Sequence, residues 1–490
     1  MCDYYRTLGI EKDASKDEIR DAYYEAARQK HPDASKDPAT EEQFLEIQKA
    51  YEVLIDPVQR AMYDASLEKE TGQPEVVVDT IYSSPVLARL DEPQLVYAVM
   101  TIGCKGDFAE FKRVPANICL VVDKSTSMEG DRLEVIKRNI FKLFERLDGE
   151  DIFSLVTFND RAEVVIPPTL AVNLPSLKKQ VSGIKAEGGT EIFQGLIRGY
   201  ETLSHASLKA GGRHLVILTD GHTYGDETSC YAMARTAAQE GIVIQALGIG
   251  HEWNDNFLDR LTGLSGGSAQ FINSPEDLLN SLDKRLNSLG SIYANHLRLE
   301  FEDNNICAIR TIFRLAPDSS PLSTENPITL GNLDYQRNQV YLIEFLVSPP
   351  QKPVRRIDLL RGELVMSVIR KKAEVRFPCW LRREIVDSVD GESPPDEIMK
   401  AVSRLTLYRL QGKARTALME NNTTEATRYL QNLATHLLSQ GNPKMAKTVL
   451  REVEAIQETG HFSKYGDKNL KYGTRALMLP AENGGQEGTT

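Results

Sequence analysis

Five side chains with oxygen ligands form the part of this sequence best suited to chemistry. They fall in three short segments: the run Asp123-x-Ser125-x-Ser127, Thr190 after two glycines, and Asp220 between a threonine and a glycine. Oxygen ligands suit a hard cation such as Mg²⁺ or Mn²⁺, which takes about six of them and often shares some positions with water or a partner. Only two of the five side chains carry charge, so a bound cation would stay attractive to a carboxylate of another protein.

Alternating strands and helices must bring these segments together. The run Asn117–Asp123 is apolar and ends at the first aspartate, as a buried parallel strand does. From there to about residue 290 strands and helices alternate, which predicts a doubly wound α/β sheet with ligands beyond the carboxyl ends of its strands. The other expected strands are Asp151–Phe158, Arg213–Thr219 and Ile242–Gly248, and the expected helices lie near residues 131–147, 190–207, 227–240 and 275–288.

In order, spacing and strand context the five residues resemble the von Willebrand factor A domains, over residues 115–290. The resemblance implies a metal-ion-dependent adhesion site, in which the same five side chains hold Mg²⁺ (or Mn²⁺) and the ion binds an acidic residue of a protein client. Alone, an Asp-x-Ser-x-Ser run is also typical of a turn whose side chains bond the backbone. Lys124 lies between two of these residues and either tunes the site or points to solvent.

A second polar segment, His31-Pro32-Asp33, lies between two amphipathic helix patterns near the N-terminus. The first pattern opens with a capping box formed by Ser15 and Glu18. The second ends at an Asp-Pro pair, where helical geometry is disfavoured. The proline of the tripeptide would hold the histidine and the aspartate at the tip of a helical hairpin, exposed to a docking partner.

With the flanking segments 3–10 and 59–64, the hairpin resembles the J domain of DnaJ-type co-chaperones over residues 3 to about 68. The resemblance implies that the tripeptide engages a DnaK-type heat-shock chaperone and stimulates its ATP hydrolysis. A basic face on the helix before the tripeptide commonly assists this docking in the family.

That helix departs from the family pattern in its charge. Tyr24 and Glu25 stand where basic residues are common, and Arg20, Arg28 and Lys30 are the basic residues that would still contribute. Acidic residues outnumber basic ones in this part of the chain, so charge steering toward an acidic chaperone surface would be weakened. The departure bears on affinity for the chaperone rather than on the fold.

Composition narrows the possible functions. The chain has 490 residues, 41% of them hydrophobic and 26% charged, which is ordinary for globular protein. A net charge of −12 without a basic stripe argues against nucleic-acid binding. The six cysteines lie far apart without a CxxC pair, which favours free buried thiols. Neither a signal-peptide pattern nor a run of about 18 apolar residues occurs, so we expect a cytoplasmic protein with no membrane span.

The segments on either side of the α/β unit carry strand patterns. Leu297, Leu299 and Phe301 alternate with polar residues, as in a half-buried antiparallel strand. We therefore expect one β-sandwich into which the α/β unit is inserted. The expected organisation is an all-α J domain at 1–68, a linker at 69–74, the first part of the sandwich at 75–114, the A domain at 115–290, the second part of the sandwich at 291–380, a helical hairpin or bundle at 394–460 and a partly disordered tail at 461–490.

Two motif sets on one chain predict an adaptor co-chaperone. The metal site would bind a client and the J domain would bring chaperone action to it. Neither a phosphate-binding glycine loop nor a nucleophile–base set occurs, so we expect no enzyme activity. Two alternatives stay open: an assembly scaffold with a degenerate J-like docking module, and a metal-dependent hydrolase in which His222 lies near a metal-bound water.

Overall fold

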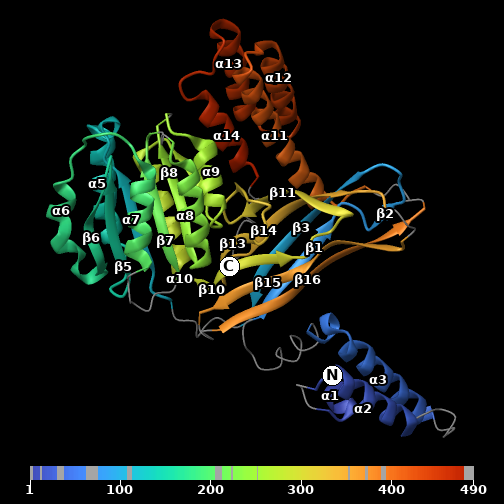
Figure 1. Cartoon of the computed structure of the whole chain (residues 1–490). Helices are drawn as coiled ribbons and strands as arrows, with labels where there is room; N and C mark the ends of the chain where they lie inside the picture. Colours follow the sequence, from blue (N-terminus) through green and yellow to red (C-terminus); the bar gives the residue numbers. More distant parts are fainter. Residues whose placement is uncertain are drawn as a thin grey trace, which may run out of the picture. The chain divides into compact units, whose positions relative to one another are not determined.

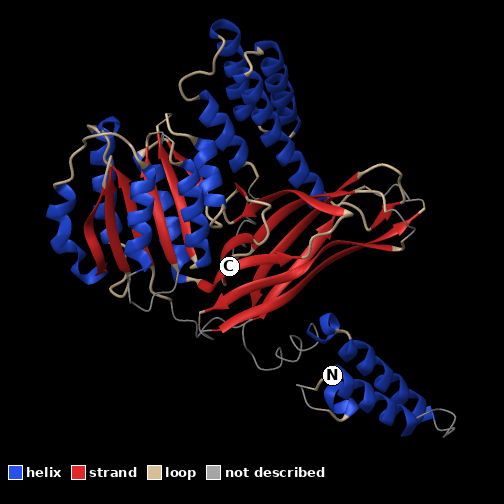
Figure 2. Cartoon of the chain, viewed as in Figure 1, coloured by secondary structure: helices blue, strands red, loops and turns tan. Residues whose placement is uncertain are grey.

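The computed structural model describes residues 4–10, 14–29, 38–61, 75–106, 113–204, 212–221, 225–250, 252–350, 354–369, 373–387 and 393–478. Figure 1 labels the helices and strands, and Figure 2 colours them by type. The chain forms two compact units, one of which holds the N-terminal helices and the other almost all of the remaining chain.

The N-terminal unit contains helices α1 (Tyr4–Leu8), α2 (Lys16–Gln29) and α3 (Pro38–Ile55). The predicted capping box is present at the start of α2. The backbone N–H of Ser15 donates to Glu18 Oε2 at 2.6 Å, and the N–H of Glu18 donates to Ser15 Oγ at 3.3 Å. The predicted helical hairpin is confirmed, since an apolar core joins the three helices through the buried residues Tyr5, Leu8, Ala14, Ile19, Ile47, Ala50 and Leu54.

A six-stranded sheet in the order β6-β5-β4-β7-β8-β9 forms the centre of the α/β unit. Neighbouring strands are parallel except β5 and β6. Every residue of β4 is buried, as expected for a central strand that is covered on both faces. The strands are β4 (Asn117–Asp123), β5 (Ile152–Phe158), β6 (Ala162–Leu170), β7 (Arg213–Thr219), β8 (Ile242–Ile249) and β9 (Ala269–Ile272).

Helices cover both faces of this sheet (Figure 2). Neighbouring residues of β4 point to opposite faces, so Leu120 joins the core beneath α5 and α10, and Val121 joins the core beneath α7, α8 and α9. The predicted doubly wound architecture is confirmed, and the structure adds the strands β6 and β9 and the helices α6 and α9 to it. The helices are α5 (Asp131–Phe144), α6 (Lys178–Ser182), α7 (Ile192–Ser204), α8 (Glu227–Gln239), α9 (Asp255–Gly263) and α10 (Pro275–Gly290), with the short 3₁₀ helices η3 (Thr126–Met128) and η4 (Ala171–Leu177).

Two five-stranded sheets form the β-sandwich, in the orders β1-β3-β14-β11-β12 and β13-β10-β15-β16-β2. Each sheet joins strands from both sides of the α/β unit: β3 pairs antiparallel with β14, and β2 pairs parallel with β16. The predicted insertion is therefore confirmed. The strands are β1 (Glu75–Tyr82), β2 (Val86–Ala88), β3 (Gln94–Lys105), β10 (Ile292–Phe301), β11 (Cys307–Ala316), β12 (Ser320–Pro321), β13 (Ile328–Asp334), β14 (Gln339–Val347), β15 (Arg356–Val368) and β16 (Ala373–Val386).

Strand β15 spans two apolar runs of the sequence. The runs Val354–Leu360 and Glu363–Ile369 both contribute to it, and it is continuous from Arg356 to Val368. Gly362 pairs with Phe301 within the ladder, and a Cβ at Gly362 would meet the Glu300 carbonyl oxygen at 2.1 Å. This glycine therefore permits a close approach between two backbones and does not mark a turn.

Four helices make up the C-terminal part: α11 (Asp396–Met419), α12 (Thr423–Ser439), α13 (Pro443–Thr459) and α14 (Gly466–Ala476). The predicted hairpin of α12 and α13 is confirmed. Helix α14 lies in the segment that the sequence assigned to the tail. Its buried side chains include Lys468, Lys471 and Arg475, so it lacks the apolar stripe by which a packed helix is normally recognised.

Several expectations fall outside the described residues: the tripeptide His31-Pro32-Asp33, Lys30, His222, the linker at 69–74 and the last residues of the tail. The described cysteines are free, and all of them are buried except Cys104, which is half-buried. In the described part of the chain, no helix combines the length and the apolar character that crossing a bilayer requires.

Candidate metal centre

The first part of the predicted site is built by the end of β4. Asp123 is its last residue and is fully buried, while Ser125 is 2% exposed. The backbone N–H of Ser125 donates to Asp123 Oδ1 at 2.8 Å. This bond turns the chain into η3, so that Ser125 Oγ lies 3.0 Å from Ser127 Oγ.

The end of β7 brings the second carboxylate to the same place. Strands β4 and β7 are parallel neighbours with Val122 opposite Leu218, so the residues that follow them meet at one edge of the sheet. Asp220 is fully buried there and accepts a hydrogen bond from Ser127 Oγ at 2.7 Å. Two carboxylates and two hydroxyls thus form one connected set of oxygen atoms.

Thr190 reaches this edge from a separate loop. A Cβ at Gly221 would lie 3.1 Å from Thr190 Oγ1, which places the threonine hydroxyl beside the residue that follows Asp220. The Gly188 carbonyl oxygen accepts from both the backbone N–H and the hydroxyl of Thr126, at 3.0 Å each, and this anchors the loop to η3. The structure therefore gathers all five predicted residues.

Two residues that the sequence did not single out as part of the site hold its carboxylates. Thr219 Oγ1 donates to Asp123 Oδ2 at 2.6 Å. Arg132, on α5, forms an ion pair with Asp220 Oδ2 and donates to the Ser127 carbonyl oxygen at 3.1 Å. Thr219 adjoins Asp220 in the sequence, whereas nothing local marks Arg132.

Charge at the site remains incompletely balanced by the protein. Burial raises the pKa of Asp123 to about 6, against the hydrogen bonds that it accepts from Ser125 and Thr219. Lys124 does not neutralise the charge of Asp123 or Asp220, because its Nζ pairs instead with Glu187 Oε1 at 2.9 Å. The open question about Lys124 is thereby answered: its side chain points to another acid.

The donor set fits a hard divalent cation. Two buried carboxylates and three hydroxyls are all oxygen ligands, and the raised pKa of Asp123 indicates a carboxylate that would gain from a nearby positive charge. Among the described residues, no group of three or more His, Cys, Asp or Glu side chains is arranged to hold a metal ion. An ion here would therefore depend on the hydroxyls as well as on the two carboxylates.

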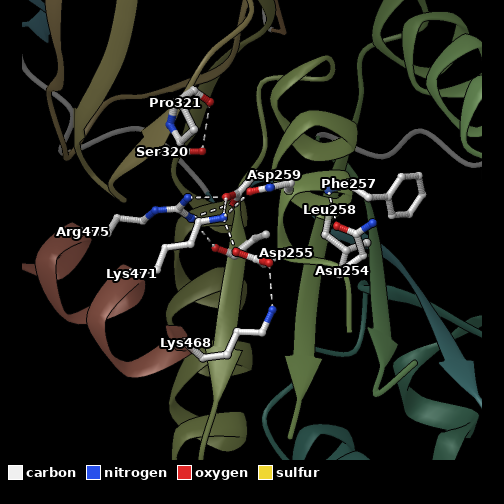
Figure 3. Close-up of polar contacts among 12 residues, drawn as sticks. Asn254, Asp255, Phe257, Leu258, Asp259, Ser320, Pro321, Lys468, Lys471 and Arg475 are labelled. Atoms are coloured by element: carbon white, nitrogen blue, oxygen red, sulfur yellow. Dashed lines mark hydrogen bonds and ion pairs between the residues drawn. The ribbon is translucent and has the colours of Figure 1, made fainter. Parts of the chain in front are cut away.

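A second pair of buried carboxylates lies on α9 of the same α/β unit, and Figure 3 shows how it is bound. Asp255 Oδ1 accepts from Lys468 Nζ at 2.9 Å, and Asp259 forms two bonds with Arg475, at 2.8 and 2.6 Å. Lys471 contacts both aspartates. We call this set, with Arg415 of α11 paired to Asp255 at 2.6 Å, the α9 joint.

The basic residues of α2 that are described are exposed. Arg20 pairs with Asp17 of its own helix at 2.7 Å, and Arg28 is exposed. The pairing offsets part of the positive charge of Arg20, which adds to the acidic character that the sequence indicated.

Comparison with known families identifies the N-terminal helices and the α/β unit. Residues 3–64 match the family model of the DnaJ domain, and residues 117–285 match that of the von Willebrand factor type A domain. The chain joins a J domain to an A domain. Residues 396–480 match a third family model, the Sll0103-like C-terminal alpha-helical domain, which includes α14.

Individual relatives cover different parts of the chain. The uncharacterized protein sll0103 of Synechocystis sp. is 28% identical over 269 residues, which are 53% of this chain and 61% of that protein. The chaperone protein DnaJ 1 of Synechocystis sp. is 56% identical over 62 residues, 13% of this chain and 16% of that protein. A solved von Willebrand factor type A protein from Catenulispora acidiphila shares the fold, with a TM-score of 0.63 at 18% identity over 82% of this chain and 96% of that one.

Proposed function

We propose that the protein is an adaptor co-chaperone that acts by binding and not as an enzyme. The A domain would hold a client through a divalent ion, and the J domain would recruit and stimulate a DnaK-type heat-shock chaperone. The observation that carries the proposal is the meeting of five oxygen-bearing side chains at the ends of β4 and β7, on a chain that also has a J domain.

The residues of the site would have distinct roles in client binding. Asp123 and Asp220 would provide the negative charge, while Ser125, Ser127 and Thr190 would provide neutral oxygens. Bound Mg²⁺ or Mn²⁺ would supply a Lewis-acidic position for a client carboxylate. Because few protein charges surround the site, a client carboxylate would complete its charge balance.

A cavity lies beside the metal centre and is lined by charged side chains of both signs. The cavity has a volume of about 940 Å³ and begins at Ser127 and Thr190. Its charged lining residues are the basic Arg260, Arg415, Lys464 and Lys468 and the acidic Glu227, Glu252, Asp255 and Asp467. Arg260 stacks over the ring of Tyr231, with 4.6 Å between the guanidinium carbon and the ring centroid. A client would therefore meet charges of both signs around the site, so the metal ion rather than a basic surface would select its carboxylate.

Calorimetric titration of the full chain with MgCl₂ or MnCl₂ tests the metal half of the proposal. We expect saturable binding that Asp220→Asn weakens at least about a hundredfold, because a charged ligand is lost. Asp387→Asn is the matched control, since its side chain is 90% exposed and lies at the sandwich. Equal binding by wild type and Asp220→Asn would contradict the site.

A single-turnover ATPase assay with a DnaK-type chaperone tests the other half. His31→Gln should abolish stimulation and leave metal binding unchanged. Stimulation that survives this replacement would refute the J-domain role.

One observation favours a second candidate, an assembly scaffold whose J domain docks without activating. The α2 helix is acidic, and Arg20 is paired within it. A wild-type chain that binds the chaperone but leaves its single-turnover rate unchanged would support this scaffold and exclude the co-chaperone.

A further inference from the structure

A second cavity, of about 560 Å³, lies where the A domain, the sandwich and α14 meet. His214 and Arg285 line it from the A domain, Arg314 and Asp318 from the sandwich, and Arg475 from α14. It shares no lining residue with the cavity beside the metal centre. Its volume is in the range of small-molecule sites, about 300–1,000 Å³.

Arg285 presents an unused edge of its guanidinium in this cavity. Its Nε and Nη2 atoms are buried and have no hydrogen-bond partner among the described residues. These two N–H groups lie on one side of the planar group, an arrangement that binds both oxygens of a carboxylate or two of a phosphate. A buried cation without such a partner is unfavourable, so the edge indicates an anionic ligand.

His214 adds a third unused donor. Its side chain is 8% exposed, and its Nε2 lies 3.1 Å from Asn332 Nδ2. Asn332 Oδ1 accepts from the His296 backbone N–H at 3.4 Å, which fixes the orientation of the amide. Nε2 must therefore accept from Nδ2, so the neutral ring carries its proton on Nδ1, and Nδ1 is buried without a partner in the described chain.

Asp318 is the carboxylate whose charge acts on Arg285, and it also serves a second arginine. Its Oδ1 forms an ion pair with Arg314 and its Oδ2 accepts from Ser268 Oγ, although Oδ1 makes no hydrogen bond among the described residues. Arg314 has further partners, because it donates to the carbonyl oxygens of Gly266 at 2.6 Å and Gly267 at 3.0 Å. Positive charge is thus in excess around Arg285.

Other residues that line the cavity also have unused hydrogen-bond donors. Tyr472 Oη and Arg475 Nε are buried without hydrogen-bond partners among the residues described. Asp334 lines the cavity as well, but it accepts from the Gln336 backbone N–H at 2.7 Å. Apart from Asp318 Oδ1, the unused polar atoms of the cavity can donate a hydrogen bond, which is the pattern that an oxyanion requires.

We propose that this cavity binds a small organic anion through a carboxylate or phosphate group, with Arg285 bound bidentately and His214 Nδ1–H as a further donor. This site is separate from the metal centre and from the proposed client surface. A ligand held here would connect the A domain to the sandwich and to α14, since all three provide lining residues.

Titration of the full chain with inorganic phosphate and, separately, with succinate tests the proposal. At least one probe should bind saturably at one site per chain, and the stronger probe identifies the chemical class. Arg285→Gln should weaken that binding at least about tenfold, because two charge-assisted hydrogen bonds are lost. Arg235→Gln is the matched control, as this arginine lies on α8, 44% exposed and paired with Glu325. Saturable binding of neither probe, or equal binding by the Gln variant, would overturn the site.

Thermal unfolding gives an independent reading if Arg285→Gln folds poorly. In probe-free buffer Arg285→Met should keep or raise the unfolding midpoint, because an unpaired buried charge is replaced by an apolar chain of similar length. Added probe should raise the midpoint of wild type and not that of the Met variant. A midpoint for Arg285→Met well below that of wild type in probe-free buffer would contradict an unpaired arginine.

Discussion

The A domain contains two pairs of buried aspartates that are balanced in opposite ways. At the α9 joint, four cations from the C-terminal helices surround Asp255 and Asp259. At the metal centre, Asp123 has hydrogen bonds from neutral groups, and one arginine pairs with Asp220. Both pairs belong to one α/β unit and both are shielded from water. The two pairs differ in how much positive charge the protein itself places beside the carboxylates.

The pKa directions express this difference. Burial raises the pKa of Asp123 to about 6. Burial would also raise the pKa of Asp255, but Arg415, Lys471 and Lys468 together hold it well below the usual aspartate value. A carboxylate that is neutralised by cations of the protein is suited to holding two parts of the chain together. A carboxylate whose negative charge the protein does not neutralise is suited to binding an exchangeable cation.

Replacing the acids one at a time should have the largest effect and is the sharpest test of this comparison. Asp255→Asn should cost about 3–5 kcal/mol, because it leaves buried cations unpaired. Asp123→Asn in metal-free buffer should change stability by no more than about 1 kcal/mol, or increase it, since burial already disfavours that charge. Equal losses for the two variants would remove the distinction.

Tryptophan fluorescence can monitor this unfolding locally. The chain has two tryptophans, and Trp253 is 1% exposed with its ring 4.3 Å from Lys468 Nζ. Urea titration in a Trp380→Phe background would therefore follow the joint itself. Asp387→Asn should change the transition by less than about 0.5 kcal/mol, because its side chain is exposed.

Lowering the pH should next distinguish the α9 joint from His214, a buried histidine on β7 of the same α/β unit. Burial and the charge of Arg285 lower the pKa of His214 to about 3, opposed by Asp318. The unfolded chain then binds the extra proton first, so stability is present above about pH 6.5 and falls as pH decreases toward 3, by about 2 kcal/mol at pH 5. The depressed pKa of Asp255 keeps the joint's contribution through this range.

Urea unfolding at pH 7 and pH 5 in anion-free buffer measures the histidine effect. His214→Gln should lose about 2 kcal/mol less than wild type between the two pH values. A variant with the same pH dependence as wild type would show that His214 does not cause it.

The smallest effect is expected from replacing Arg132, the residue that forms an ion pair with Asp220 at the metal centre. A metal ion and this guanidinium compete for Asp220, so Arg132→Ala should strengthen Mg²⁺ binding by a few-fold. Arg138→Ala on the same helix is the control, because that side chain is exposed and bonds the Glu134 carbonyl oxygen. Calorimetry that gives weaker binding for Arg132→Ala would assign the arginine a supporting role instead.

Sequence alone could predict the features that have local causes. The apolar runs that end at Asp123 and Thr219 predicted two strand ends, and the doubly wound topology then implied that their polar neighbours meet. The capping box at Ser15 is equally local, since both partners lie within one turn.

Long-range charge pairing could not be predicted in this way. Asp255 pairs with Lys468 and Lys471, which lie more than 200 residues away, and no periodicity connects them. Helix α14 was missed for the same reason, because it buries cations where a helix normally buries apolar residues. The continuity of β15 through Gly362 could not be predicted either, because close backbone approach and a turn both favour glycine.

The insertion of the A domain has a consequence for how the chain is made. Gln339 of β14 pairs with Ile102 of β3, and Val386 of β16 pairs with Ala88 of β2. Each sheet therefore cannot be completed until a strand has been synthesised that lies far along the chain from its partner. Until then the edge of β3 is open, with the apolar residues Val96, Ala98 and Met100 that are buried in the finished sheet. The A domain lies between these strands and can complete its own sheet first. On the ribosome, we therefore expect completion of the sandwich to be the step most exposed to aggregation and a late, slow event of folding.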